Sequence, residues 1–402
     1  MKNISLNDLA AYCLAGYAFA SAISITMAEA CLILGLIAWL ASAVRERKSR
    51  TPRIAAQVTV ALTVFLVIHF INAVFGIDPK SGIRDFGKAW IILTLFFACA
   101  NSQNEKMRGI ISTAFIIGAA FVGAYASINT IYHRYYLAEI NFRASSFSGN
   151  HMHAGGMLMM AAVFTATMIA SRVKFGMWRN RGTILLAAAF ILISCGLLFT
   201  YTRGSWLGAA CGLVIAALLT DKRILAAGVV AALLLVFLMR DTSFIKRAES
   251  GIKVKEKSSA GERLYMWQSG IQMIRDRPLI GIGTGNLEKI YPKYRKEGAM
   301  EQNAGHLHNN IIQVGVINGI PGILAFLWVF ISIWAAFARA LAAKPEQGKA
   351  TLILASLSVS AAFFVNGFFE YNLFSSQPAM MFWFLMGFGF SAVPDVNEPV
   401  KT

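Results

Sequence analysis

The feature that most restricts the fold is a series of long apolar runs along the whole chain. About twelve of them approach the roughly 20 residues that one helix needs to cross a hydrocarbon core about 30 Å thick. The 402 residues are 57% hydrophobic and 14% charged, whereas an ordinary soluble domain carries about 25% charged residues. The sequence therefore predicts an all-α polytopic membrane protein with about twelve transmembrane helices.

These runs divide the chain into three parts. Residues 1–239 hold the first nine spans, residues 240–320 form the one large polar segment, with amphipathic helices, and residues 321–402 hold three more spans and a tail. The expected spans cover residues 9–26, 27–44, 54–75, 86–101, 109–131, 152–171, 183–201, 205–220, 224–239, 321–338, 351–369 and 376–393.

Positive charge is unevenly divided between the two sides of these spans. A net charge of +17 would suggest a nucleic-acid partner in a soluble protein, but in a membrane protein loop cations set the orientation. Every second loop, beginning with residues 45–53, carries 16 lysines and arginines in total, and the opposite short loops carry six. The positive-inside rule places the first set and both termini in the cytoplasm. The large polar segment then faces outward, and no nucleic acid is expected.

One helix is predicted inside the polar segment. Ser259-Ala260-Gly261-Glu262 has the spacing of a helix-capping box, and Pro278 ends the run that follows. Apolar residues repeat between them at helical spacing: Leu264, Trp267, Ile271 and Ile274. We expect an amphipathic helix on the outer surface with Arg263 in its first turn. Its apolar stripe is interpreted as packing rather than as a ligand site.

A break is predicted near the start of the tenth span. One helix from Asn309 to Ala338 would be about 45 Å long, which is more than a span needs. Asn318-Gly319 followed by Ile320-Pro321-Gly322 is typical of a turn, and proline suits the first position of a helix. We therefore expect a short helix, a break and then the span, with His308 at the start of the short helix near the outer interface.

Two arginines are candidates for binding an anion. Arg203 lies in a tight turn between two spans, where an ionisable group is costly and usually functional, although a snorkelling interface cation is the alternative. Its guanidinium would present a rigid fork to a phosphate, which lysine cannot copy. Arg263 is one of thirteen cations in its segment, so by itself it is better interpreted as a solvated charge.

Four of the six histidines form two His-x-His pairs, His151 with His153 and His306 with His308. Such pairs permit a metal site, but the sequence has no carboxylate cluster near either pair, so no metal is predicted. His308 is more attractive as a general base. A helix N-terminus and nearby arginines would both disfavour its imidazolium form.

Other features on the outer side are weaker. Further cations there suggest an anion pocket together with Arg203 and Arg263, although each could be an interface anchor: Lys80, Arg84, Lys88, Arg134 and Arg143. Gly281-Ile282-Gly283-Thr284-Gly285-Asn286 resembles a phosphate-binding loop but lacks the final glycine and the strand–helix unit. We interpret it as a flexible turn.

A family resemblance follows from these motifs. His308-Asn309, nine residues, Gly319, two residues and Gly322 resembles the pattern of the O-antigen ligase and polymerase superfamily. Tyr201-Thr202-Arg203-Gly204, Gly261-Glu262-Arg263 in the large outer segment and the twelve-span topology extend the resemblance over roughly residues 140–375.

The resemblance implies an O-antigen ligase, a membrane enzyme of C-type glycosyltransferase character. Such an enzyme transfers glycan from undecaprenyl pyrophosphate to lipid A–core on the periplasmic face of the Gram-negative inner membrane, without metal or cofactor. It implies that Arg203, Arg263 and His308 are essential, with Arg143 a fainter match to a phosphate contact and Asn309 within the motif. Attack opposite the leaving group would invert the anomeric centre.

Alternative functions remain. A polymerase or a protein O-oligosaccharyltransferase of the same superfamily would use similar residues with another acceptor. A secondary transporter of an anionic lipid or solute would show inverted repeats and polar residues at mid-membrane depth. The sequence shows no repeat, and its candidate charges gather at one interface.

Overall fold

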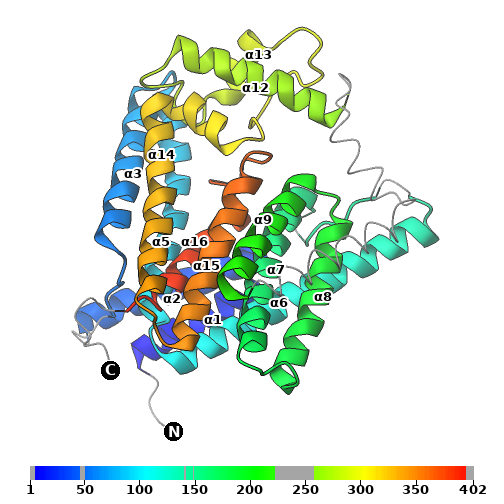
Figure 1. Ribbon diagram of the computed structural model, residues 1–402. Coiled ribbons are helices and arrows are strands. Elements are labelled where there is room, and N and C mark those ends of the chain that lie inside the picture. The colour runs from blue at the N-terminus through cyan, green and yellow to red at the C-terminus, as the bar shows by residue number, and fades with distance from the viewer. Residues whose placement is uncertain (1–4, 46–49, 140–141, 148, 222–257, 395–402) are drawn as a thin grey trace.

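A computed structural model describes residues 5–45, 50–139, 142–147, 149–221 and 258–394. Within these ranges the ordered elements are all helical, and no strand occurs (Figure 1). Eight of the described helices are long and apolar enough to cross a membrane. They are α2 (Ile25–Arg45), α3 (Ala56–Phe75), α6 (Glu105–Ile131), α7 (His151–Lys174), α8 (Arg181–Phe199), α9 (Arg203–Thr220), α14 (Asn310–Ala342) and α15 (Gln347–Asn366). The predicted all-α fold is confirmed, and the chain is a multi-pass membrane protein.

Three other apolar helices fall short of a span: α1 (Leu6–Ala20), α5 (Leu93–Asn101) and α16 (Ser376–Phe390). The expected span 86–101 is broken, because α4 (Pro79–Phe86) and a 3-10 turn, η1 (Gly87–Ile92), precede α5. α16 packs against α5, α7 and α15 and is buried over most of its length. The expected span 224–239 lies outside the described residues, so the count of twelve and the three-part division stay predictions.

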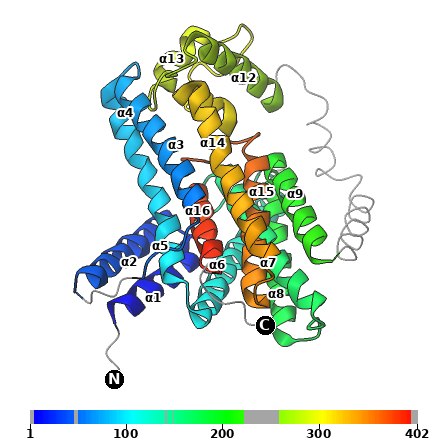
Figure 2. The same ribbon diagram turned by 60° about the vertical axis from the view of Figure 1, so that its left-hand side comes forward.

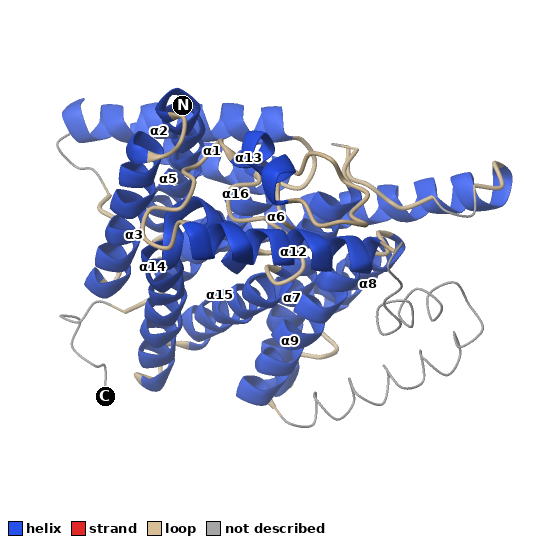
Figure 3. Cartoon of the chain, turned by 90° about the horizontal axis from the view of Figure 1, so that it is seen from above, coloured by secondary structure: helices blue, strands red, loops and turns tan. Residues whose placement is uncertain are grey.

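The polar segment forms a cap over one end of the long helices. Its two described helices, α12 (Ser259–Asp276) and α13 (Leu287–Tyr294), lie across that end (Figures 1 and 2). Seen from above, α12 crosses over the ends of the bundle near α14, α15 and α7 (Figure 3). The loop between α8 and α9 and the loop after α15 lie at the same end of the spans (Figure 1), and residues of both loops line one pocket together with Ser259 and Arg263 of α12.

The predicted helix in the polar segment is confirmed, but its details differ. Its N-cap is Ser258, not Ser259, and the Glu262 carboxylate instead accepts backbone hydrogen bonds from Met300 (2.8 Å) and Glu301 (3.1 Å). The predicted apolar stripe is partly wrong, because two of its members, Leu264 and Ile271, are each 43% exposed. The inner face is formed by Met266, Ser269, Gly270 and Met273, flanked by Trp267 and Ile274. The face of α12 that packs against the start of α14 is therefore next to the predicted apolar stripe and does not coincide with it.

The predicted break in α14 is confirmed at Gly319, whose φ is 67° and ψ −169°. A Cβ at this position would lie 2.5 Å from the carbonyl oxygen of Pro278, so the site requires glycine. Polar side chains of α3 satisfy the residue before the break. Asn72 donates to the Asn318 carbonyl oxygen (3.1 Å), and His69 Nδ1 lies 3.0 Å from Asn318 Oδ1.

The glycine loop at residues 281–286 is a turn, as predicted, but it is packed rather than flexible. Gly281, Gly283 and Gly285 all have positive φ, and the backbone N–H groups of Ile282 and Gly283 donate to carbonyls of α14 (2.8 and 3.1 Å). The Ile282 carbonyl accepts from the backbone N–H of Ile77, in the turn that follows α3 (3.1 Å). These hydrogen bonds use the donors that a phosphate would need, so the loop joins α3 to α14 instead of binding an anion.

Candidate active site

His308 lies directly before α14 in a strained backbone conformation. Its φ is 50°, which is uncommon for a residue other than glycine, and strained residues of this kind cluster at functional sites. The next residue, Asn309, holds this geometry. Its side-chain oxygen accepts from Ile312 N (3.0 Å), and its amide donates to the Phe368 carbonyl (3.1 Å). Because both ends of this buried side chain are occupied, the geometry favours a positioning role for Asn309 rather than the predicted substrate contact.

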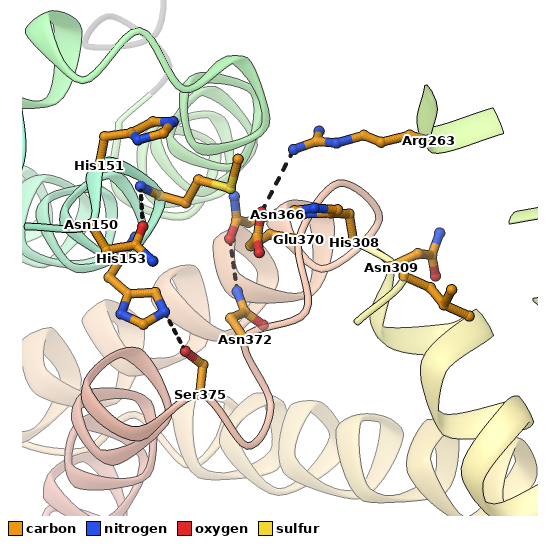
Figure 4. A network of polar contacts seen from close by, with 12 residues as sticks. Asn150, His151, His153, Arg263, His308, Asn309, Asn366, Glu370, Asn372 and Ser375 are labelled. Carbon is orange, nitrogen blue, oxygen red and sulfur yellow. Dashed lines mark hydrogen bonds and ion pairs between the residues drawn. The ribbon is translucent and has the colours of Figure 1, made fainter. Parts of the chain in front are cut away.

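Glu370, in the loop after α15, connects the base candidate to an arginine. His308 Nδ1 lies 3.0 Å from Glu370 Oε2, and Arg263 Nη2 lies 3.6 Å from the same oxygen (Figure 4). Burial alone would raise the pKa of the Glu370 carboxyl. The hydrogen bond from His308 and the nearby positive charges outweigh that effect and hold the pKa below its ordinary value.

A chain of buried amides fixes the Glu370 loop in place. Asn310 and Asn372 exchange two hydrogen bonds (2.7 and 3.1 Å), and Asn372 donates to Asn366 Oδ1 (2.7 Å; Figure 4). Asn366 in turn donates to Ser205 Oγ on α9 (3.2 Å). The start of α14, the end of α15 and the start of α9 are thereby joined by one network, and satisfied buried networks of this kind specify a single arrangement.

Arg203 is the first residue of α9 and follows the tight turn from α8. Tyr201 in that turn has a φ of 53°, and the Arg134 guanidinium, from the π-helical turn η2 (Tyr132–Tyr136), lies 4.2 Å from its ring centroid. Gly204 faces the Glu370 loop so closely that a Cβ would lie 2.7 Å from Phe369. The turn therefore places Arg203 beside the loop that carries Glu370.

Two pockets meet at this site. The smaller, of about 60 Å³, is lined by the guanidinium-bearing residues Arg143, Arg203 and Arg263 and by Glu370, Tyr201, Thr202 and Ser205, among others. The larger, of about 630 Å³, is lined by His306 and His308 together with Asn150, Glu301 and Asn303, among others. His151 and Met152 line both pockets, so the two spaces adjoin.

The three arginines repel one another. Burial lowers the pKa of Arg263; the Glu370 charge opposes this effect, and the charges of Arg203 and Arg143 add to it. Burial likewise lowers the pKa of Arg143, and so do the charges of Arg203 and Arg134. Arg143 Nη1 also lies 3.3 Å from His151 Nε2. A dianion bound between these guanidinium groups would relieve the repulsion, which makes the small pocket suited to a phosphate or pyrophosphate.

The predicted site residues divide into two groups. The structure brings His308, Arg263, Arg203 and Arg143 together around the Glu370 loop. It does not bring Lys80, Arg84 and Lys88 to them: these three are exposed, lie on α4 and η1, and line neither pocket. Lys88 forms an ion pair with Asp85 instead. The geometry gives these three cations no part in the arginine pocket.

Glu370 is the residue that the sequence interpretation missed. Residues 351–369 were expected to form one span, but α15 ends at Asn366 and a loop that contains Glu370 follows. An acidic residue at the end of an apolar run was the available signal, because ionisable groups at such positions are usually functional. Its carboxylate gives the His308 ring a hydrogen-bond partner that the sequence interpretation did not anticipate.

Comparison with known proteins agrees with this site. Residues 188–327 match the family model described as O-antigen ligase, and this range contains Arg203, Arg263 and His308. A Rickettsia conorii protein with the provisional name polysaccharide ligase RC0486 is 26% identical over 312 residues, covering 73% of this chain and 70% of the relative. The exopolysaccharide production protein ExoQ of Rhizobium meliloti is 24% identical over 334 residues, covering 78% and 72%. The resemblance seen in the sequence is thus confirmed over residues 188–327, which match the O-antigen ligase family model.

Proposed function

We propose that this protein transfers a glycan from undecaprenyl pyrophosphate to lipid A–core oligosaccharide, as an inverting and metal-independent O-antigen ligase. The observation that carries the proposal is the pocket lined by Arg143, Arg203 and Arg263, which adjoins a second pocket lined by His308. One pocket suits the leaving pyrophosphate and the other an acceptor sugar. The match of residues 188–327 to the O-antigen ligase family model and the similarity to a protein named polysaccharide ligase support the reaction class.

The arginines would act on the leaving group. As the bond between the anomeric carbon and the pyrophosphate oxygen breaks, negative charge grows on the departing phosphate. Each charge-assisted hydrogen bond from a guanidinium contributes about 1.5–3 kcal/mol. Preorganised positive charge of this kind is usually the largest single contribution to catalysis.

His308 would act on the acceptor. If its Nδ1–H donates to Glu370, Nε2 is free to accept the proton of an acceptor hydroxyl as the oxygen attacks the anomeric carbon. Glu370 would fix the ring orientation and stabilise the imidazolium that forms, in the manner of a histidine–carboxylate pair. General base catalysis of this type contributes about 10²–10⁴ in rate. Attack on the face opposite the pyrophosphate inverts the configuration.

The proposed orientation follows from the loop charges. The capped end carrying α12 would face the periplasm, both termini would lie in the cytoplasm, and the undecaprenyl tail would lie between spans in the inner membrane. The donor pyrophosphate would then sit at the outer interface, next to Arg203 at the start of α9.

A lipid-linked polysaccharide polymerase is the second candidate function. It is favoured by one observation, the similarity to a protein named for exopolysaccharide production. The polymerase would use the same arginine pocket and the same base, and the acceptor would be the end of another lipid-linked glycan instead of lipid A–core.

The test is an in vitro assay with purified full-length protein in proteoliposomes. A defined undecaprenyl-pyrophosphate glycan is offered with lipid A–core, with a second lipid-linked glycan or with neither, in the presence of a chelator. Transfer to lipid A–core supports the ligase, and chain extension supports the polymerase. Hydrolysis alone, or transfer only after a divalent ion is restored, would contradict the proposal.

A further inference from the structure

His306, His308 and Glu370 together have the groups to ligate a metal ion, and the proposed mechanism gives them no such role. One ring nitrogen from each histidine and one carboxylate oxygen lie within 4.8 Å of one another. The two imidazole rings meet edge to face with centroids 4.2 Å apart. Among the described residues no other group of three such side chains converges in this way.

His306 provides a second and independent observation. Its Nδ1 atom is buried and has no hydrogen-bond partner among the described residues. A buried polar atom without a partner costs about 1–3 kcal/mol, so its presence needs an explanation. A metal ion at the adjacent donors would supply the missing partner.

The donor set fits a borderline transition metal ion. Two imidazoles and one carboxylate are a common ligand set for Zn²⁺, with bonds of about 2.0–2.2 Å, and a fourth position is usually left to water. His306 and His308 both line the pocket of about 630 Å³, which gives such a water a place and the ion an entry path. Arg263 lies 3.6 Å from Glu370 Oε2 and would weaken binding by repulsion, so the site is suited to reversible occupancy rather than to a permanent structural ion.

We propose that His306, His308 and Glu370 bind Zn²⁺ reversibly and that the bound ion blocks glycan transfer. The inhibitory half rests on the proposed function, because it requires His308 to be the base. If the ion takes His308 Nε2, it occupies the lone pair that would accept the proton. If the ion binds Nδ1 of the neutral ring, the ring proton is on Nε2, and Nε2 then has no lone pair to accept the acceptor proton. Either mode of coordination disables the base.

Binding is tested first without any activity readout. Purified full-length protein is titrated with Zn²⁺ against a chromogenic zinc chelator, and the competition gives stoichiometry and affinity. We expect one ion per chain for the wild type and at least about tenfold weaker binding for His306→Gln and for Glu370→Gln. His133→Gln is the matched control, since it removes a histidine from another histidine–carboxylate pair, with Glu139, and should bind as the wild type does.

Inhibition is tested next, with each variant normalised to its own rate without zinc. Wild type and His133→Gln should lose transfer at zinc concentrations that leave His306→Gln unaffected, and a chelator should restore the loss. Absence of stoichiometric binding, or equal binding by wild type and His306→Gln, overturns the site. Stoichiometric binding in a protein that transfers no glycan overturns the proposed function and leaves the site standing. Transfer that requires zinc overturns the inhibitory role.

Discussion

The segment from His308 to Gly322 carries two polar clusters, and their surroundings differ. At the kink of α14, Asn318, His69 and Asn72 are at most 2% exposed, and they hydrogen-bond to one another. The His69 ring stacks on Phe374 with centroids 4.9 Å apart. These three side chains are enclosed by the protein, and His69 is the one ionisable group among them.

The cluster at the other end of the segment is open and charged. His308 and Glu370 border two pockets, Arg263 lies against Glu370, and the backbone at His308 is strained. The comparison teaches that one continuous motif serves two purposes. Its glycine and Asn318 determine the path of α14, whereas its histidine has the proposed catalytic role. The following variants test that division, beginning with the largest expected effect.

Replacing the proposed base should remove catalysis but leave the fold intact. We expect His308→Gln to transfer glycan about 10²–10⁴ times more slowly, because general base catalysis contributes a factor of that size. Initial rates of the purified variant measure the effect, and thermal unfolding should stay close to the wild-type midpoint. His133→Gln serves as the control. A variant that transfers at the wild-type rate would refute the role of His308.

Replacing the Arg203 guanidinium with the ammonium group of lysine should have the next largest effect. Arg203→Lys keeps the charge but loses paired hydrogen bonds, and one charge-assisted bond is worth about 1.5–3 kcal/mol, or about 10–100-fold in rate. Donor titrations in the transfer assay would show the loss. Arg84→Lys, the same substitution on exposed α4, should change the rate less than about twofold. Equal losses in the two variants would remove Arg203 from the site.

Neutralising Glu370 should change the pH profile as well as the rate. Its pKa is lowered from the ordinary value of 4.5, so the carboxylate contributes stability above that pH and loses it as the pH falls through the lowered value. Between about pH 5 and pH 8 it therefore remains charged, and wild-type transfer should decline below that range, where the Glu370 carboxyl takes up a proton.

In Glu370→Gln the carboxylate is absent at every pH, so the maximal rate should fall and the decline that comes from protonation of Glu370 should disappear. Rate–pH profiles of this variant and of Glu139→Gln, in the exposed pair with His133, would measure this change. A lower rate with an unchanged profile would mean that Glu370 only supports the loop.

Disrupting the closed cluster should affect stability more than chemistry. Asn318→Ala removes the Oδ1 partner of His69 in a buried site, which costs about 1–3 kcal/mol, whereas Asn72 keeps its hydrogen bond to the backbone carbonyl of residue 318. We expect a lower midpoint of thermal unfolding and a rate per folded molecule within a few-fold of the wild type. A loss of rate as large as that of His308→Gln, in a protein of wild-type stability, would contradict the division between the two clusters.

The sequence was sufficient for features with a local cause. Apolar length predicted the eight described helices that are long enough to cross a membrane. Asn-Gly and Pro predicted the break at Gly319, and the motif that contains Gly261 and Glu262 predicted a helix that begins just before Arg263. It failed where packing decides. Leu264 lies outside the buried face because Gly270 brings α12 against α14, and Ser258 replaces Ser259 as the cap because Glu262 binds a distant loop.

The candidate site could be predicted only in part, because some of its contacts depend on how distant segments pack together. Motif residues pointed to His308, Arg203 and Arg263, but no local pattern joins His308 to Glu370, 62 positions later. That contact depends on the exchange of hydrogen bonds between Asn310 and Asn372, which only the folded chain shows. Conversely, the sequence placed three further cations on the same side of the membrane as the site, namely Lys80, Arg84 and Lys88. The folded chain holds them on α4 and η1, where they line neither pocket.

The central claim is that arginines hold the leaving pyrophosphate while His308 receives the acceptor proton. Equilibrium binding of undecaprenyl pyrophosphate to the wild type, His308→Gln and Arg203→Lys tests it most directly. The account predicts that His308→Gln binds as tightly as the wild type without transferring glycan, and that Arg203→Lys binds at least about tenfold more weakly. Wild-type affinity in Arg203→Lys, or binding by His308→Gln that falls in step with its transfer rate, would contradict it.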